Sequence, residues 1–158
     1  MDELKQQGFI FGTIFTVSNK LQILGDEFYK DITTKQLLFM IGVSKFKKPP
    51  MISEVANYIG YSRQNAKRIA SDLQKKGFVT ISKDIYDARV LRIGLTSECK
   101  EYFKELDKQE IEFIQKIFSG FDSELTNSMY KGLVKLEANL KELMIDENTN
   151  IGSDRNET

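Results

Sequence analysis

The sequence predicts a mostly helical protein with a three-helix core, a β-hairpin after it, and long helices at both ends. Three observations predict this class. Apolar residues recur at helical spacing near both termini, two short helical segments flank a tight connection at Gly60, and two alternating segments follow them. The 158 residues are enough for one domain with its own core together with dimerisation helices.

The composition excludes several classes of protein. Histidine is absent and cysteine occurs once, at Cys99, which removes histidine-dependent triads, histidine metal sites and intrachain disulfides. We expect no catalytic residues, no metal and no cofactor, although a carboxylate-only metal site or a Lys or Tyr base stays open. No apolar run approaches the roughly 18–20 residues of a membrane span, and the polar start MDELKQQG is unlike a secretory signal. We therefore expect a cytoplasmic protein with no membrane partner.

The net charge of zero hides an uneven distribution. Residues 43–92 carry 11 Lys and Arg against 4 Asp and Glu, residues 93–158 carry 8 against 14, and residues 1–42 carry 4 against 5. A basic middle between acidic ends favours one surface that binds a polyanion. On charge alone, chance clustering on a solvated surface explains the pattern equally well.

Residues 1–30 are expected to form an N-terminal dimerisation helix. Its apolar side chains step by 4, 3, 4, 3 and 4 residues, which is the spacing of a heptad seam. The seam consists of Ile10, Ile14, Val17, Leu21, Leu24 and Phe28.

Residues 31–95 are expected to form a winged helix-turn-helix domain. Thr33 and Gln36 make a capping box that starts a helix running to about Phe46, and KFKKPP ends it because proline cannot continue a helix. A short helix then covers about 52–59. Gly60 ends this helix and Ser62 caps the next, and two helices joined by three or four residues are typical of the helix-turn-helix.

Alternation over 78–82 and 90–95 predicts the two strands of the hairpin, the wing. Their connection, KDIYDAR, is longer than a two-residue turn and is therefore expected to project. Near the tip, Asp87 lies two residues before Arg89, so the carboxylate can orient the arginine for insertion into a narrow minor groove. An ordinary surface salt bridge is the alternative.

Residues 96–145 are expected to form two C-terminal dimerisation helices, capped by Thr96 and Asp122 and ending at about residues 119 and 144. The second helix carries another seam, formed by Met129, Leu133, Leu136, Leu140 and Leu143. The two terminal seams hold more apolar surface than a small core needs, which favours dimerisation over packing within one chain. Residues 146–158 are polar and are expected to form a disordered tail.

The stretch SRQNAKRIASDLQKKG, residues 62–77, predicts a helix with a narrow core stripe and a polar, largely cationic remainder. On a helical wheel the core stripe consists of Ala66, Ile69, Ala70 and Leu73. The opposite side carries Gln64, Lys67, Arg68, Ser71 and Lys75, with Asn65 on a flank. Amides and cations of this kind read base edges in the major groove, whereas Lys75 and Lys76 near the helix end suit phosphate. A plain solvent face is the alternative.

Together the stretches ISEVANYIGYSRQNAKRIASDLQKKGFV and SKDIYDARVLRIGLT resemble the MarR family, the multiple-antibiotic-resistance type of bacterial winged-helix regulators. The resemblance runs from about Asp31 to Phe103, and more loosely through both terminal helices. It implies a homodimer whose terminal helices interlock and whose winged lobes straddle double-stranded DNA. It assigns the recognition-helix role to Ser62, Arg63, Gln64, Asn65, Lys67 and Arg68, and the wing-tip role to Arg89 with Asp87 as its orienter. Family wings often carry Arg or Lys at the position of Ile81 and Pro at that of Ile85, so fewer phosphate contacts along the wing are expected.

The resemblance also implies release from DNA by a small apolar or phenolic effector bound between the dimer helices and the lobe. The compatible aromatic residues are Phe9, Phe11, Phe15, Phe28, Tyr29 and Phe39, although such residues are more often plain core. Zinc-sensing relatives depend on histidine, which this chain lacks. Redox-sensing relatives use a cysteine in the first helix. Cys99 instead follows Thr96 at a helix start, which can lower a thiol pKa, but a buried, idle cysteine is expected.

The sequence is compatible with three functions. The first is a transcriptional regulator, by preference a repressor, that binds a palindromic operator as a homodimer with the recognition helix in the major groove. The second is a winged-helix module that binds proteins and lacks specific DNA binding. The basic residues Arg63, Lys67, Arg68 and Arg89 count against this module. The third, an enzyme, is remote because histidine and a glycine-rich phosphate loop are absent.

Overall fold

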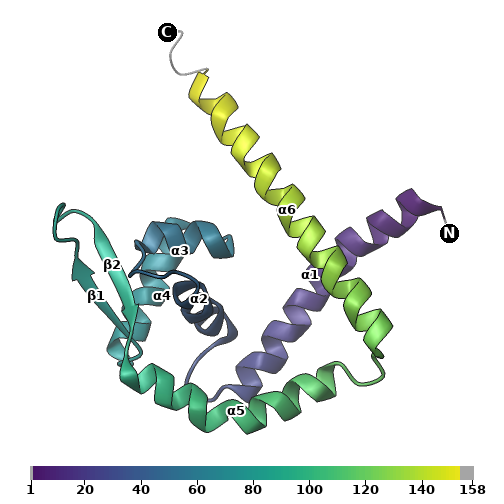
Figure 1. Cartoon of the computed structure of the whole chain (residues 1–158), viewed down its shortest axis with the longest axis horizontal. Helices are drawn as coiled ribbons and strands as arrows, with labels where there is room; N and C mark the ends of the chain where they lie inside the picture. The colour runs from purple at the N-terminus through teal and green to yellow at the C-terminus, as the bar shows by residue number, and fades with distance from the viewer. Residues whose placement is uncertain (1, 154–158) are drawn as a thin grey trace. The chain divides into compact units, whose positions relative to one another are not determined.

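The computed structural model describes residues 2–153, and the side chains of residues 2–145. The described chain is mostly helical with one antiparallel hairpin, so the predicted winged-helix fold class is confirmed (Figure 1). The elements are α1 (Glu3–Phe28), α2 (Thr34–Ser44), α3 (Ile52–Ile59), α4 (Arg63–Lys75), β1 (Val79–Lys83), β2 (Leu91–Leu95), α5 (Ser97–Ile117) and α6 (Ser123–Ser153). The chain divides into two compact units between Leu106 and Asp107.

A close approach joins α1 to α2. A Cβ atom on Gly25 would lie 2.3 Å from Oγ1 of Thr34, so only glycine allows the contact. The Thr34 hydroxyl donates to the carbonyl of Gln22 over 3.1 Å. The predicted capping box is present: Gln36 N donates to Thr33 Oγ1 (3.2 Å), and Thr33 N donates to Gln36 Oε1 (3.1 Å). These bonds satisfy backbone donors that the start of a helix leaves unpaired.

The turn between α3 and α4 has the predicted chemistry. Gly60 has φ 75°, a left-handed conformation that glycine adopts without a steric penalty. The next amide, Tyr61 N, donates to Ala56 O over 2.9 Å and closes α3. Ser62 Oγ then accepts from Asn65 N at 3.2 Å and caps α4. The helix-turn-helix therefore lies where the sequence placed it.

The hairpin is in register from Val79 opposite Leu95 to Lys83 opposite Leu91. Figure 1 shows it extending from the cluster formed by α2, α3 and α4. A feature that was not predicted adds to the hairpin: Met51 forms an antiparallel bridge with Arg92, one residue from the Lys83–Leu91 pair that ends the ladder at the loop. Ile93 N also donates to Pro50 O over 2.9 Å. The loop before α3 thus acts as a short third strand and anchors the wing to the helices.

The core lies between α2, α3, α4 and the hairpin. Its largest fully buried side chains are Phe39, Met40, Leu73, Ile93, Val55 and Cys99. Burying a side chain of the size of Leu or Phe contributes about 1.5–3 kcal/mol. This lobe therefore has a core of its own.

The last two helices begin at the predicted caps. Thr96 Oγ1 accepts from Cys99 N at 3.1 Å, and Asp122 Oδ1 accepts from Leu125 N at 2.8 Å. However, α6 continues to Ser153, past its predicted end near residue 144, and the disorder expected of residues 146–158 stays a prediction. The polar composition argued against a packed core there, but the stretch contains no proline to interrupt helical hydrogen bonds. Residues 154–158 of that predicted tail lie outside the described residues. Within residues 2–153, no helix is long and apolar enough to cross a membrane.

Candidate nucleic-acid interface

Helix α4 presents two different faces. Ala66, Ile69, Ala70 and Leu73 are all buried, as the helical wheel predicted. Arg63, Gln64, Lys67, Arg68, Ser71 and Lys75 are all exposed. Small alanines on the buried side let α4 pack closely against α2 and α3, which leaves long cationic and amide side chains in solvent.

The start of α4 is pre-ordered by a short hydrogen-bond chain. Half-buried Asn65 donates its backbone N–H to the cap, Ser62. Its side-chain Oδ1 accepts from Nη2 of Arg68 at 3.1 Å. Asn65 therefore supports Arg68, and the Arg68 guanidinium is held on the exposed face one turn after the helix start.

The end of α4 differs from the prediction in one respect. Lys76 was expected to suit phosphate, but its Nζ donates to Asp31 O (2.6 Å) and to Gln36 Oε1 (3.0 Å). This ammonium ties α4 to the start of α2 and is used within the lobe. Lys75 stays exposed and lies 3.9 Å from Asp72, a weak surface ion pair.

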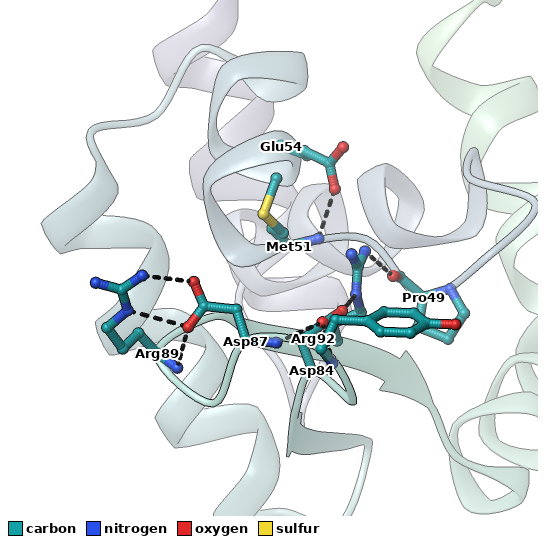
Figure 2. Close-up of polar contacts among 8 residues, drawn as sticks. Pro49, Met51, Glu54, Asp84, Asp87, Arg89 and Arg92 are labelled. Carbon is teal, nitrogen blue, oxygen red and sulfur yellow. Dashed lines mark hydrogen bonds and ion pairs between the residues drawn. The ribbon is translucent and has the colours of Figure 1, made fainter.

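The wing holds Arg89 in a two-pronged contact with Asp87 (Figure 2). Arg89 Nε donates to Oδ1 and Nη2 to Oδ2, each over 3.0 Å. The Arg89 side chain is 91% exposed, so it is oriented without being covered. These bonds hold the pKa of the Asp87 carboxyl below its ordinary value and raise the pKa of the Arg89 guanidinium. The structure therefore contains the hydrogen bonds through which Asp87 was predicted to orient Arg89.

A second arginine–aspartate pair, which was not predicted from the sequence, lies within the wing and links it to the loop before α3. Arg92 Nε donates to Asp84 Oδ2, and Arg92 Nη1 donates to Pro49 O over 3.0 Å (Figure 2). Asp84 Oδ1 accepts from the amides of Tyr86 (2.9 Å) and Asp87 (3.1 Å), which shapes the tip. The Arg92 hydrogen bond is the largest cause that lowers the pKa of Asp84. The hairpin register, which places Arg92 near Asp84, would have been the signal.

Three of the predicted residues meet at one place. Arg63 and Lys67 from α4 and Arg89 from the wing line a common hollow of about 240 Å³ beside the start of α3. The other predicted DNA-binding residues do not line this hollow: Ser62, Gln64, Asn65, Arg68, Ser71, Lys75 and Asp87. The predicted set thus falls into two groups.

Metal binding and thiol chemistry have few candidate residues in the described part of the chain. Within residues 2–145, no group of three or more Cys, Asp or Glu side chains is placed to hold a metal ion. Cys99 is buried with its Sγ 3.6 Å from Met40 Sδ, and burial raises the pKa of its thiol. A raised pKa lowers the thiolate fraction, so this cysteine is poorly suited to redox sensing.

Most residues of the predicted seams on α1 and α6 are exposed within the single chain. Ile10, Val17, Met129, Leu133, Leu140 and Leu143 are exposed, and Ile14 and Leu136 are half-buried. Of the aromatic residues considered for an effector pocket, Phe39 and Tyr29 are core, whereas Phe9, Phe11 and Phe15 on α1 are exposed.

The fold is shared with solved structures of transcriptional regulators. The MarR protein from Peptoclostridium difficile DA00132 is 21% identical with a TM-score of 0.74, covering 84% of this chain and 88% of that chain. S. aureus MepR, in a complex with DNA, is 19% identical with a TM-score of 0.70, covering 82% and 97%. An organohalide-sensing RdhR regulator in its 2,4-dichlorophenol-bound form is 15% identical with a TM-score of 0.71, covering 88% and 85%.

In sequence, the chain is 27% identical over 94 residues to the transcriptional repressor MprA of Escherichia coli strain K12. The match covers 60% of this chain, and the chain spans about half, 53%, of the length of that curated relative. No protein-family model matches the chain. The resemblance to MarR-type regulators predicted from the sequence is confirmed in fold by the solved structures.

Proposed function

We propose that this protein is a transcriptional regulator that binds a specific double-stranded DNA sequence as a homodimer. One observation carries the proposal: the exposed polar face of α4 lies in the same lobe as a wing whose Arg89 is oriented and exposed. Sequence readout needs side chains that reach base edges in the major groove, and an arginine in the minor groove adds to it; α4 and the wing supply both.

The roles divide along α4. Gln64 and Arg68 read base edges near the helix start, where side chains reach deepest into the major groove. Lys75, farther along, contacts phosphate and adds affinity without sequence preference. On the wing, Arg89 enters the minor groove with Asp87 fixing its orientation.

The homodimer forms through the terminal helices. The exposed seams on α1 and α6 supply the apolar surface that a partner copy covers. Two-fold symmetry then requires a palindromic operator whose half-sites lie about one helical turn apart, roughly 10 bp. We further propose repression, by analogy with MprA, and release by a small apolar or phenolic effector that the exposed aromatic residues of α1 help to bind.

The experiment that tests this function selects DNA with the purified full chain from randomised and own-genome fragments. The selected sequence is then titrated against a scrambled duplex at two salt concentrations. A palindromic sequence bound far more tightly than the scrambled duplex is the expected result. Uniform weak binding that vanishes with salt would contradict the proposal and favour the protein-interaction module.

A further inference from the structure

The hollow beside the start of α3 has a lining that is selective in charge. Its charged side chains are Arg63, Lys67 and Arg89, all cations, and Ser53 adds a hydroxyl. The rest of the lining is supplied by Met51, Ile52, Val90 and Leu91. Because three elements contribute to this hollow, a ligand there would contact α3, α4 and the wing at once.

Two of the three cations lack a counter-charge. Both oxygens of Asp87 are occupied by Arg89. Among the described residues, neither the Arg63 nor the Lys67 side chain has a hydrogen-bond or ion-pair partner. These two residues are four apart on one helix, so their side chains are neighbours and repel each other. An anion in the hollow would relieve this repulsion.

We propose that the hollow binds one backbone phosphate of DNA, held jointly by Arg63 and Lys67 with the Ser53 hydroxyl as a further donor. The proposal rests on the proposed DNA-binding function and assigns a different task to part of the recognition helix. Arg63 and Lys67 fix the register of the lobe on the backbone, and the base readout is left to Gln64 and Arg68, which lie outside the hollow. A single phosphate contacted by α4 beside the wing would also set the depth at which Arg89 meets the minor groove.

The test compares Arg63→Gln/Lys67→Gln with the full wild-type chain, using fluorescence anisotropy on the selected operator and on a scrambled duplex at several salt concentrations. The control, Lys100→Gln/Lys104→Gln, removes the same two charges from exposed positions on α5. Thermal unfolding checks that all three proteins are equally folded, which is expected because Arg63 and Lys67 are exposed.

The double variant should weaken binding to both duplexes by the same factor, on the order of tenfold, because phosphate contacts carry no sequence preference. The slope of log affinity against log salt should fall by about 1.8, which is about 0.9 for one phosphate in each of the two half-sites, although the homodimer loses four charges. Each single variant should already show most of this loss of affinity, because both cations are needed to hold the one phosphate. The control should change neither quantity.

A loss confined to the operator would overturn the proposal, because it would mean that Arg63 and Lys67 read bases. A fall of the slope by about 3.6 would also overturn it, because it would indicate two separate phosphates in each half-site. The outcomes are separable from those of the proposed function. If the wild-type chain did not prefer the operator, specific regulation would fail, and the slope measured on the scrambled duplex would still report on the phosphate.

A second measurement locates the phosphate. Operators in which single phosphates are replaced by neutral methylphosphonates are titrated with the wild-type chain and the double variant. At one position per half-site the wild type should lose affinity, whereas the double variant should lose none. If no position behaved in this way, the joint phosphate contact would be refuted.

Discussion

Similar apolar side chains are buried in the winged lobe and exposed on the terminal helices. In the lobe, Val55 and Leu73 are completely buried by their own chain. Along α6, Leu133 is 48% exposed and Leu140 is 50% exposed. Since burying such a side chain contributes about 1.5–3 kcal/mol, the lobe has gained this free energy within one chain and the seam has not.

One hydrophobic pattern therefore serves two purposes in this molecule. Periodic apolar residues on α4 build a core and thereby aim polar side chains outward. The same periodicity on α1 and α6 leaves a surface that only another chain can cover, in our proposal. The stability of the lobe and the assembly of the dimer should therefore respond to different substitutions.

The largest expected effect is on assembly. Leu136→Asp places a charge in the middle of the α6 seam, and an unpaired charge buried in an interface costs about 3–5 kcal/mol. We expect the dimer to dissociate at micromolar concentration, as measured by light scattering or analytical ultracentrifugation. Ala138→Asp, on the same helix but off the seam, is the matched control and should leave the dimer intact. A Leu136→Asp protein that stays dimeric would refute the assignment of the seam.

Stability of the lobe gives the next largest effect. Leu73→Ala removes a fully buried side chain, and we expect it to lower the free energy of unfolding by about 3 kcal/mol. Leu140→Ala should instead raise the dissociation constant of the dimer, because it weakens association. Denaturation measures the first effect, and analytical ultracentrifugation at several protein concentrations measures the second. If Leu140→Ala lowered the free energy of unfolding but left the dissociation constant unchanged, the α6 seam would pack within its own chain.

Sequence reasoning succeeded where local patterns carry the information. The core stripe of α4, the capping box at Thr33, and the αL glycine at Gly60 all depend on residues within one or two turns of each other. It failed where distant segments meet. The Lys76 ammonium donates hydrogen bonds to Asp31 and Gln36, which lie 45 and 40 residues earlier in the chain.

The wing shows the same limit. The Asp87–Arg89 pair is visible as neighbours in sequence, whereas Arg92 reaches Pro49 and Asp84 only after the hairpin has paired. The hollow lined by Arg63 and Arg89 likewise forms only where residues 51–53 lie beside residues 89–91 at the loop end of the wing. Periodicity places a residue on a face, but it does not say which other segment comes to lie beside it.

Readout of DNA is expected to give intermediate effects. Gln64→Ala should weaken binding to the best operator by about 1–3 kcal/mol and relax its sequence preference, because a base contact is lost. Lys75→Gln should weaken all sequences alike and flatten the salt dependence, because a phosphate contact is lost. Anisotropy titrations on operator and single-base variants distinguish the two. If the two patterns were exchanged, the face of α4 that enters the groove would have to be rotated.

The smallest expected effect concerns the wing pair, which one chain completes without a partner. Hydrogen bonds from Arg89 lower the pKa of Asp87 in the folded protein. A lowered folded pKa means that the pair is present at neutral pH and is lost only as the pH falls through that lowered value. A ¹³C NMR titration should therefore give Asp87 a midpoint below that of an ordinary aspartate, about 3.9, and Arg89→Gln should raise it. Asp84, whose main partner is Arg92, is the internal control. The same midpoint should be found in the dissociated Leu136→Asp protein, because the pair belongs to the lobe alone; a midpoint that moved on dissociation would show that the lobe depends on the dimer.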